Sequence, residues 1–227
     1  MNTRPSPSRL AVGLAVILAT TLGTTLSIGH AATLTVTVLA RNGEPLADAV
    51  VIVEPAQAGQ PAAPSPKKVE IRQEKLQFVP QVSVLPVGSQ VVFSNLDRYD
   101  HHVRALPADG TALSAAPDRG FAIALPARVG EEPPSTAIET LNEPGPWQLG
   151  CHLHGSMRGS IYVTDSPWVV KTDATGQATV TQLPEGPAQV RLWYPRQLVE
   201  QPATPTTIGP TTQLRLPTTI RPPRRRS

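Results

Sequence analysis

The 227-residue sequence has only one cysteine, and only 16% of its residues are charged. One cysteine cannot form a disulfide within the chain, and alone it cannot build a zinc knuckle or an iron–sulfur cluster. Proline is abundant, with 26 residues. Because proline breaks helix interiors, a mostly helical protein is not expected. The hydrophobic content of 40% is enough for a buried core, which excludes a wholly disordered chain.

The body of the chain also lacks an excess of positive charge. Of its 20 lysines and arginines, two lie in residues 1–31 and four in residues 221–227, which leaves 14 basic against 17 acidic residues in between. The sequence therefore gives no support for nucleic-acid binding. Residues 221–227 predict a basic, disordered tail, with a patch for anionic lipid or an acidic partner as the alternative.

The first 31 residues have the layout of a secretory signal peptide. Arg4 and Arg9 precede an apolar stretch over residues 10–22, and Gly29 and Ala31 place small residues around a cleavage site after Ala31. An uncleaved membrane anchor is the alternative, although the apolar run is thin for a span. Both alternatives predict an exported protein, periplasmic or otherwise outside the cytoplasm, and no second span is expected in the mature chain.

Short strand-like segments follow one another along the sequence, and no stretch has a helical period. Residues 33–38 alternate threonine with leucine or valine, Asn42-Gly43 predicts a hairpin turn, and residues 49–53 predict a second strand. Residues 57–68, rich in Ala, Pro, Gln and Ser, predict an exposed loop. Further strands are predicted at 75–79, 82–86, 89–94, 120–125, 145–150, 160–164, 168–170, 177–183 and 189–194. The pattern indicates an all-β chain of sandwiches or barrels.

Metal-binding residue types gather in two short segments. Four of the five histidines and the lone cysteine lie in them: His101 and His102 in the first, and Cys151, His152 and His154 in the second, followed by Met157. A thiolate with two imidazoles and a weak thioether suits copper. Zinc is the competing metal, because Cys and His also suit it. One imidazole would come from the pair His101-His102.

Cys151-x-x-His154-x-x-Met157 before a strand, with Asn95 and the run His101-His102-Val103 upstream, resembles the cupredoxins, with a spacing like that of amicyanin and shorter than that of plastocyanin. The resemblance covers residues 67–165 and implies a Greek-key sandwich with one type 1 copper ion. By position it assigns His101, Cys151, His154 and Met157 as the metal ligands, with His102 as the alternative to His101. His152 is then expected at the surface.

The rest of the chain carries a second resemblance. Asn42-Gly43-Glu44-Pro45-Leu46 and, later, Thr172–Gly176 and Leu183–Gly186 resemble a carboxypeptidase regulatory-like, or transthyretin-like, sandwich. With the copper segment between them, these pieces resemble the exported bacterial group called methylamine utilization proteins. We therefore expect a discontinuous small sandwich, 33–56 plus 166–220, with the cupredoxin domain 67–165 inserted. The alternative is that residues 33–56 add to the cupredoxin sheet.

These resemblances imply an electron-transfer protein, not an enzyme, whose redox partner is a protein such as a c-type cytochrome or a dehydrogenase. In the family, the ligand at the place of His154 lies near the surface, and apolar residues such as Leu153 form the docking patch. Copper storage, delivery or sensing is the first alternative, and a structural envelope module is the second. A nucleophilic Cys–His enzyme is also conceivable from Cys151, but no signature of such a family is present.

Overall fold

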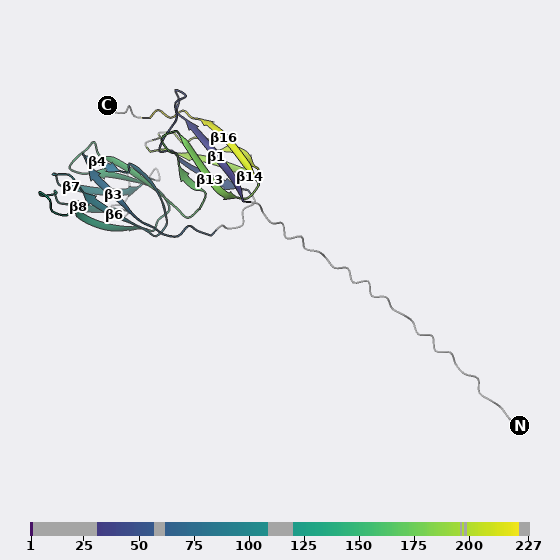
Figure 1. Cartoon of the computed structure of the whole chain (residues 1–227), viewed down its shortest axis with the longest axis horizontal. Helices are drawn as coiled ribbons and strands as arrows, with labels where there is room; N and C mark the ends of the chain where they lie inside the picture. Colours follow the sequence, from purple (N-terminus) through teal and green to yellow (C-terminus); the bar gives the residue numbers. More distant parts are fainter. Residues whose placement is uncertain (2–30, 57–61, 109–119, 196, 198, 223–227) are drawn as a thin grey trace.

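The computed structural model describes residues 1, 31–56, 62–108, 120–195, 197 and 199–222. The predicted signal peptide falls almost entirely outside the described residues, as do positions 57–61 of the predicted loop and 223–227 of the predicted tail. Within the described part, every regular element is a β-strand, so the prediction of an all-β chain is confirmed. The strands form two sandwiches that lie side by side (Figure 1). No helix in the described part is long and apolar enough to cross a membrane.

The first sandwich combines the start of the described chain with its end. One sheet has the order β13-β1-β16 and the other β12-β2-β14-β15. The strand bounds are β1 Ala32–Leu39, β2 Val50–Pro55, β12 Val169–Lys171, β13 Gln177–Leu183, β14 Gly186–Trp193, β15 Thr204–Ile208 and β16 Thr211–Pro217. Leu34, Val36 and Val38 of β1 are fully buried between the sheets, as their alternation with threonine predicts.

The Asn42-Gly43 pair lies in the predicted turn, which is closed by a short antiparallel bridge between Leu39 and Pro45. Gly43 does make a turn, with φ of 83° and its amide donating to the Ala40 carbonyl at 2.9 Å. However, β1 and β2 belong to opposite sheets, so the chain crosses the sandwich after this turn. The predicted turn is therefore present, while β1 and β2 each pair along their length with strands more than a hundred residues away.

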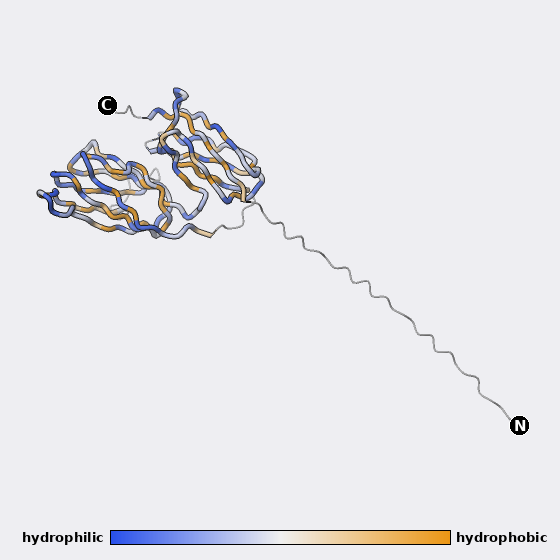
Figure 2. Tube along the Cα trace, viewed as in Figure 1, coloured by the Kyte–Doolittle hydropathy of each residue, from blue (hydrophilic) through white to orange (hydrophobic). Residues whose placement is uncertain are grey.

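The second sandwich is built from the middle of the chain. One sheet has the order β4-β3-β6-β9 and the other β5-β11-β10-β7-β8. The bounds are β3 Lys68–Glu74, β4 Gln77–Val79, β5 Val82–Pro86, β6 Ser89–Asn95, β7 His101–Pro107, β8 Phe121–Leu125, β9 Ser135–Leu141, β10 Gly145–Cys151 and β11 Arg158–Thr164. Hydrophobic and hydrophilic residues alternate along these strands (Figure 2), and side chains such as Phe93, Ile71 and Ile161 fill the space between the sheets.

The predicted strand 75–79 is shorter in the structure, where β4 covers only Gln77–Val79. Lys75 and Leu76 instead form the turn that joins β3 to β4. The sequence pattern does not predict β3, because its outward positions are charged and only Ile71 and Gln73 are fully buried. The turn at Lys75 and Leu76 lies beside the candidate site described below.

A small apolar cluster joins the two sandwiches. Val50 and Ile52 of β2 and Val169 of β12 pack with Val82 of β5, and the rings of Tyr162 and Trp193 lie 5.6 Å apart between centroids. Tyr162 is opposite Pro146, near the start of β10. The contact therefore lies about five residues along β10 from Cys151, which is about 17 Å of strand.

Candidate metal centre

The ends of β7 and β10 bring His101 and Cys151 together. These strands are antiparallel neighbours, with Cys151 opposite Val103. Because side chains alternate between faces, His101 lies on the same inward face as Val103 and Cys151. His101 is 1% exposed and Cys151 5% exposed, so both donor atoms lie inside the end of the second sandwich.

The loop between β10 and β11 places two more candidate ligands, His154 and Met157, at the same end of the sandwich. The Met157 amide donates to the His154 carbonyl at 2.9 Å, which closes a tight turn three residues after Cys151. Met157 is fully buried and belongs to the same apolar core as Cys151, whereas His154 is only half-buried. The cysteine-histidine-methionine spacing therefore produces one compact loop, in which the methionine side chain is buried and the histidine side chain is partly exposed.

Three donor atoms form a nearly equilateral triangle. Cys151 Sγ lies 3.6 Å from His101 Nδ1 and 3.4 Å from His154 Nδ1, and the two Nδ1 atoms are 3.2 Å apart. The circle through the three atoms has a radius of about 2.0 Å, close to a metal–imidazole bond of about 2.0–2.1 Å and somewhat shorter than a metal–thiolate bond of about 2.3 Å. The donor set thus fits a soft or borderline metal ion with small adjustments.

Asp97 fixes the orientation of His101. Its Oδ2 lies 3.0 Å from His101 Nε2, on the side of the ring away from Cys151. An ionised carboxylate can only accept here, so Nε2 carries the hydrogen and Nδ1 keeps its lone pair directed toward the triangle. This is the arrangement that a metal-binding histidine needs, since the outer hydrogen bond sets both the tautomer and the ring orientation.

The Asp97 carboxylate is itself held by the turn between β3 and β4. The amides of Lys75 and Leu76 donate to its two oxygens at 2.6 and 2.9 Å. Both turn residues have positive φ, 52° and 58°, a conformation that side-chain-bearing residues rarely adopt. Burial alone would raise the pKa of Asp97, but the hydrogen bonds from Leu76, His101 and Lys75 outweigh it and lower that pKa. A lowered pKa means that this carboxylate stabilises the fold above the ordinary pKa of an aspartate and loses that contribution as the pH falls through the lower folded-state value.

Asn95 secures the loop that carries Asp97. Its buried amide donates to the carbonyls of Tyr99 and Pro126 at 2.8 and 2.9 Å, and also to that of Leu125 at 3.1 Å. Its oxygen accepts from the Asp97 amide at 2.9 Å. The segment between β6 and β7 is therefore bonded at both ends before His101 begins the next strand.

His102 and His152 point away from this triangle. Their rings face one another, 5.8 Å apart between centroids, on the outer side of the same strands. Among the described residues the cluster of close donor atoms contains His101, Cys151 and His154, and His102 is not in it. His152 is exposed, as the alternation of an extended strand predicts.

The role of Asp97 was not evident from the sequence. Asp97 lies between Asn95 and His101 in the sequence, but only the folded chain brings its carboxylate to the amides of Lys75 and Leu76. One local signal is Asn95, because asparagine side chains often accept a hydrogen bond from the amide two residues later in an Asx turn, as Asn95 does from Asp97.

Substituting Asp97 by asparagine is expected to lower copper affinity by about 10–100-fold, because the group that orients a ligand histidine is weakened. Asp100→Asn is the matched control. Its carboxylate also accepts a backbone amide, from Ala127, but among the described residues no hydrogen bond or ion pair joins it to a candidate ligand. Competition for Cu(I) with a chelator measures the difference. Equal affinities for the two variants would contradict the positioning role.

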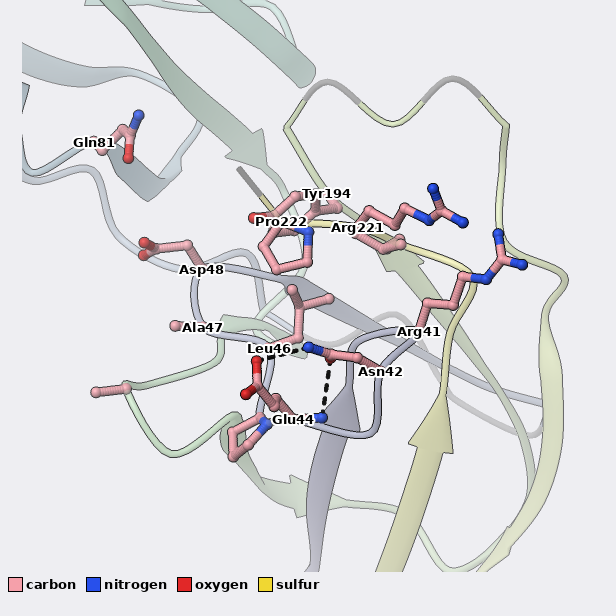
Figure 3. Close-up of a pocket in the computed structure, with 13 residues that line it drawn as sticks. Arg41, Asn42, Glu44, Leu46, Ala47, Asp48, Gln81, Tyr194, Arg221 and Pro222 are labelled. Carbon is pink, nitrogen blue, oxygen red and sulfur yellow. Dashed lines mark hydrogen bonds between the residues drawn. The ribbon is translucent and has the colours of Figure 1, made fainter. Parts of the chain in front are cut away.

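A pocket in the first sandwich is a separate feature (Figure 3). The loop after β1 lines one side, with Asn42 donating to Glu44 at 2.7 Å, and Tyr194 and Arg221 line the other. Gln81 is the contribution of the second sandwich. The lining has no cysteine or histidine, and it brings together none of the predicted site residues.

Solved structures match up to about half of this chain. The Cu-containing nitrite reductase NirK of Thermus scotoductus is 25% identical, with a TM-score of 0.33, over 50% of this chain and 25% of that one. Amicyanin of Paracoccus versutus is 22% identical, with a TM-score of 0.29, over 42% of this chain and 80% of that one. A purple cupredoxin of Nitrosopumilus maritimus is 17% identical, with a TM-score of 0.30, over 42% and 99%. The chain spans only about a quarter of the nitrite reductase. Comparisons with protein-family models and with curated proteins find no match.

Proposed function

We propose that the second sandwich is a cupredoxin-type domain that binds one type 1 copper ion and serves in electron transfer. The observation that carries this proposal is the triangle of one thiol and two imidazoles, with donor atoms 3.2–3.6 Å apart. Cys151 is the proposed thiolate ligand, His101 and His154 are the imidazole ligands, and Met157 is the weak axial ligand. The ion would supply the one-electron couple between Cu(II) and Cu(I).

The surroundings of the triangle favour electron transfer because they limit movement of the ligands. His101 is held by Asp97, which two backbone amides hold in turn, and His154 is fixed by the turn to Met157. Ligands that stay in place when the charge of the ion changes keep the reorganisation energy low. A site built only for temporary metal binding does not need this constraint.

The exposed side of His154 is the proposed contact for a redox partner. Tyr99, 60% exposed, has its ring 6.3 Å from that of His154, and Leu153, 55% exposed, is the adjacent residue. These side chains give the surface an apolar character close to the ligand. The apolar cluster that joins the two sandwiches lies toward the other end of β10, so it does not cover this surface.

We further propose that the two sandwiches are separate domains of an exported protein. Strands β1 and β2 pair only with strands between residues 169 and 217 within the described ladders, which supports a discontinuous domain 33–56 plus 166–220. The predicted signal peptide supports a periplasmic location. The redox partner is then a periplasmic protein such as a c-type cytochrome or a dehydrogenase, and the domain itself transforms no substrate.

The two adjacent histidines give the test of this ligand assignment. His101→Ala is expected to abolish the visible copper band, because it removes an inward donor atom and leaves Asp97 without its partner. His102→Ala is expected to leave the band in place, because its ring lies on the outer face. Visible absorption after addition of Cu(II), with voltammetry of the coloured protein, measures both. Loss of the band in His102→Ala alone would overturn the assignment, and a colourless wild-type protein would overturn the type 1 site.

A further inference from the structure

The two histidines outside the triangle form a cross-strand pair of their own. His152 follows Cys151, and its amide donates to the His102 carbonyl at 2.9 Å. His102 precedes Val103, the residue opposite Cys151. The two positions therefore face each other on the outer side of the sheet, where opposed side chains lie about 4.5–5.5 Å apart at Cβ.

Both imidazoles are available to an ion from solution. His152 is exposed and His102 is half-buried, and within the described part of the chain neither ring takes part in a hydrogen bond or an ion pair. The rings meet at 72° with centroids 5.8 Å apart. Because a metal–imidazole bond is about 2.0–2.1 Å long, rotation of the side chains at this separation can bring one nitrogen of each ring to a common ion.

We propose that His102 and His152 form a second, exposed metal site that binds Cu²⁺ through two imidazole nitrogens, with water completing the coordination. Imidazole suits divalent copper, which ranks highest among the first-row divalent ions for such donors. This site is distinct from the buried triangle, since the two sets lie on opposite faces of β7 and β10, and it goes beyond the proposed electron-transfer function.

Neighbouring charges make the second site weaker than the first. Arg104 lies on the same face two residues after His102, and Arg158 is opposite Gly150, two residues before His152. No carboxylate stands among these cross-strand neighbours, so the ion gains no charge compensation from them. A site with two neutral ligands and cationic neighbours exchanges its ion readily, which suits the capture or release of copper at the protein surface.

The test uses the full chain with the buried site removed by Cys151→Ser and His154→Ala together. Titration of this background with Cu²⁺, followed by calorimetry and electron paramagnetic resonance, is expected to show Cu²⁺ binding without the intense visible band. Adding His152→Ala is expected to weaken that binding at least about tenfold, since one of two protein ligands is lost. Gln148→Ala is the matched control, because Gln148 is exposed on the same face of β10.

The outcomes separate this proposal from the proposed function. Because the background lacks the buried triangle, the result does not depend on whether that triangle holds copper. His30 and the chain terminus are the same in all variants, so any copper that they bind cancels in the comparison. Equal Cu²⁺ affinity with and without His152→Ala, or no binding by the background, would overturn the second site. His102→Ala in the otherwise wild-type chain provides a second check, because it is also expected to lose the equivalent of Cu²⁺ bound at the second site.

Discussion

Replacing Cys151 with serine is expected to abolish the intense visible band of the copper-loaded protein and to lower its copper affinity at least about a hundredfold, or about 2.7 kcal/mol. The band requires a thiolate bound to Cu(II), and Cys151 is the only cysteine in the sequence. No other residue can therefore restore it. Visible absorption and competition with a copper chelator measure the two effects.

Serine is a conservative replacement here, because its side chain is similar in size to that of cysteine. Cys151 lies in the apolar core of the second sandwich, so a larger change would also disturb packing. We expect the metal-free variant to unfold close to the wild type, whereas copper raises the unfolding temperature of the wild type much more than that of the variant, since an ion that binds only the folded state stabilises it. An intense band in Cys151→Ser, or equal stabilisation of both proteins by copper, would show that the thiol is not a ligand.

The sequence alone predicts a candidate donor set as a group, because the chemistry depends on residue types and spacing. Cys151, His154 and Met157 lie within one loop, so any strand–loop–strand arrangement brings them close together. His101 is different: its distance from Cys151 depends on the pairing of β7 with β10, and only the register distinguishes it from His102. The residues alone left that choice open.

The support around the site depends on contacts that local patterns do not encode. Asp97 accepts amides from a turn more than twenty residues earlier, and that turn uses Lys75 and Leu76 where glycine or asparagine would be the usual signal. The same turn falls inside a segment predicted as a strand. The turn at Asn42-Gly43 is a local feature that the sequence predicts, but it does not encode the long-range partners of β1 and β2.

The second large effect is expected from Gly176→Ala, in the first sandwich. Gly176 has φ of 72°, and an added Cβ would lie 2.7 Å from the Val38 carbonyl oxygen and 2.9 Å from the Leu46 amide nitrogen. Both are backbone atoms, so neither can rotate away. The strain of positive φ and the overpacking together are expected to lower the free energy of unfolding by about 2–4 kcal/mol.

Gly209→Ala is the matched control in the same sandwich, because its added Cβ would meet only Thr212 Oγ1, at 3.9 Å, and its φ is not positive. Urea unfolding of both variants measures the difference in stability, and the copper band reports on the second sandwich at the same time. The strained region and the candidate metal centre belong to different sheets, and a small apolar cluster joins the described residues of the two sandwiches. We therefore expect Gly176→Ala to unfold at lower urea while the copper band persists beyond the first transition. A single transition in which stability and colour are lost together would show that the two sandwiches unfold as one unit, which would contradict their separation into independent domains.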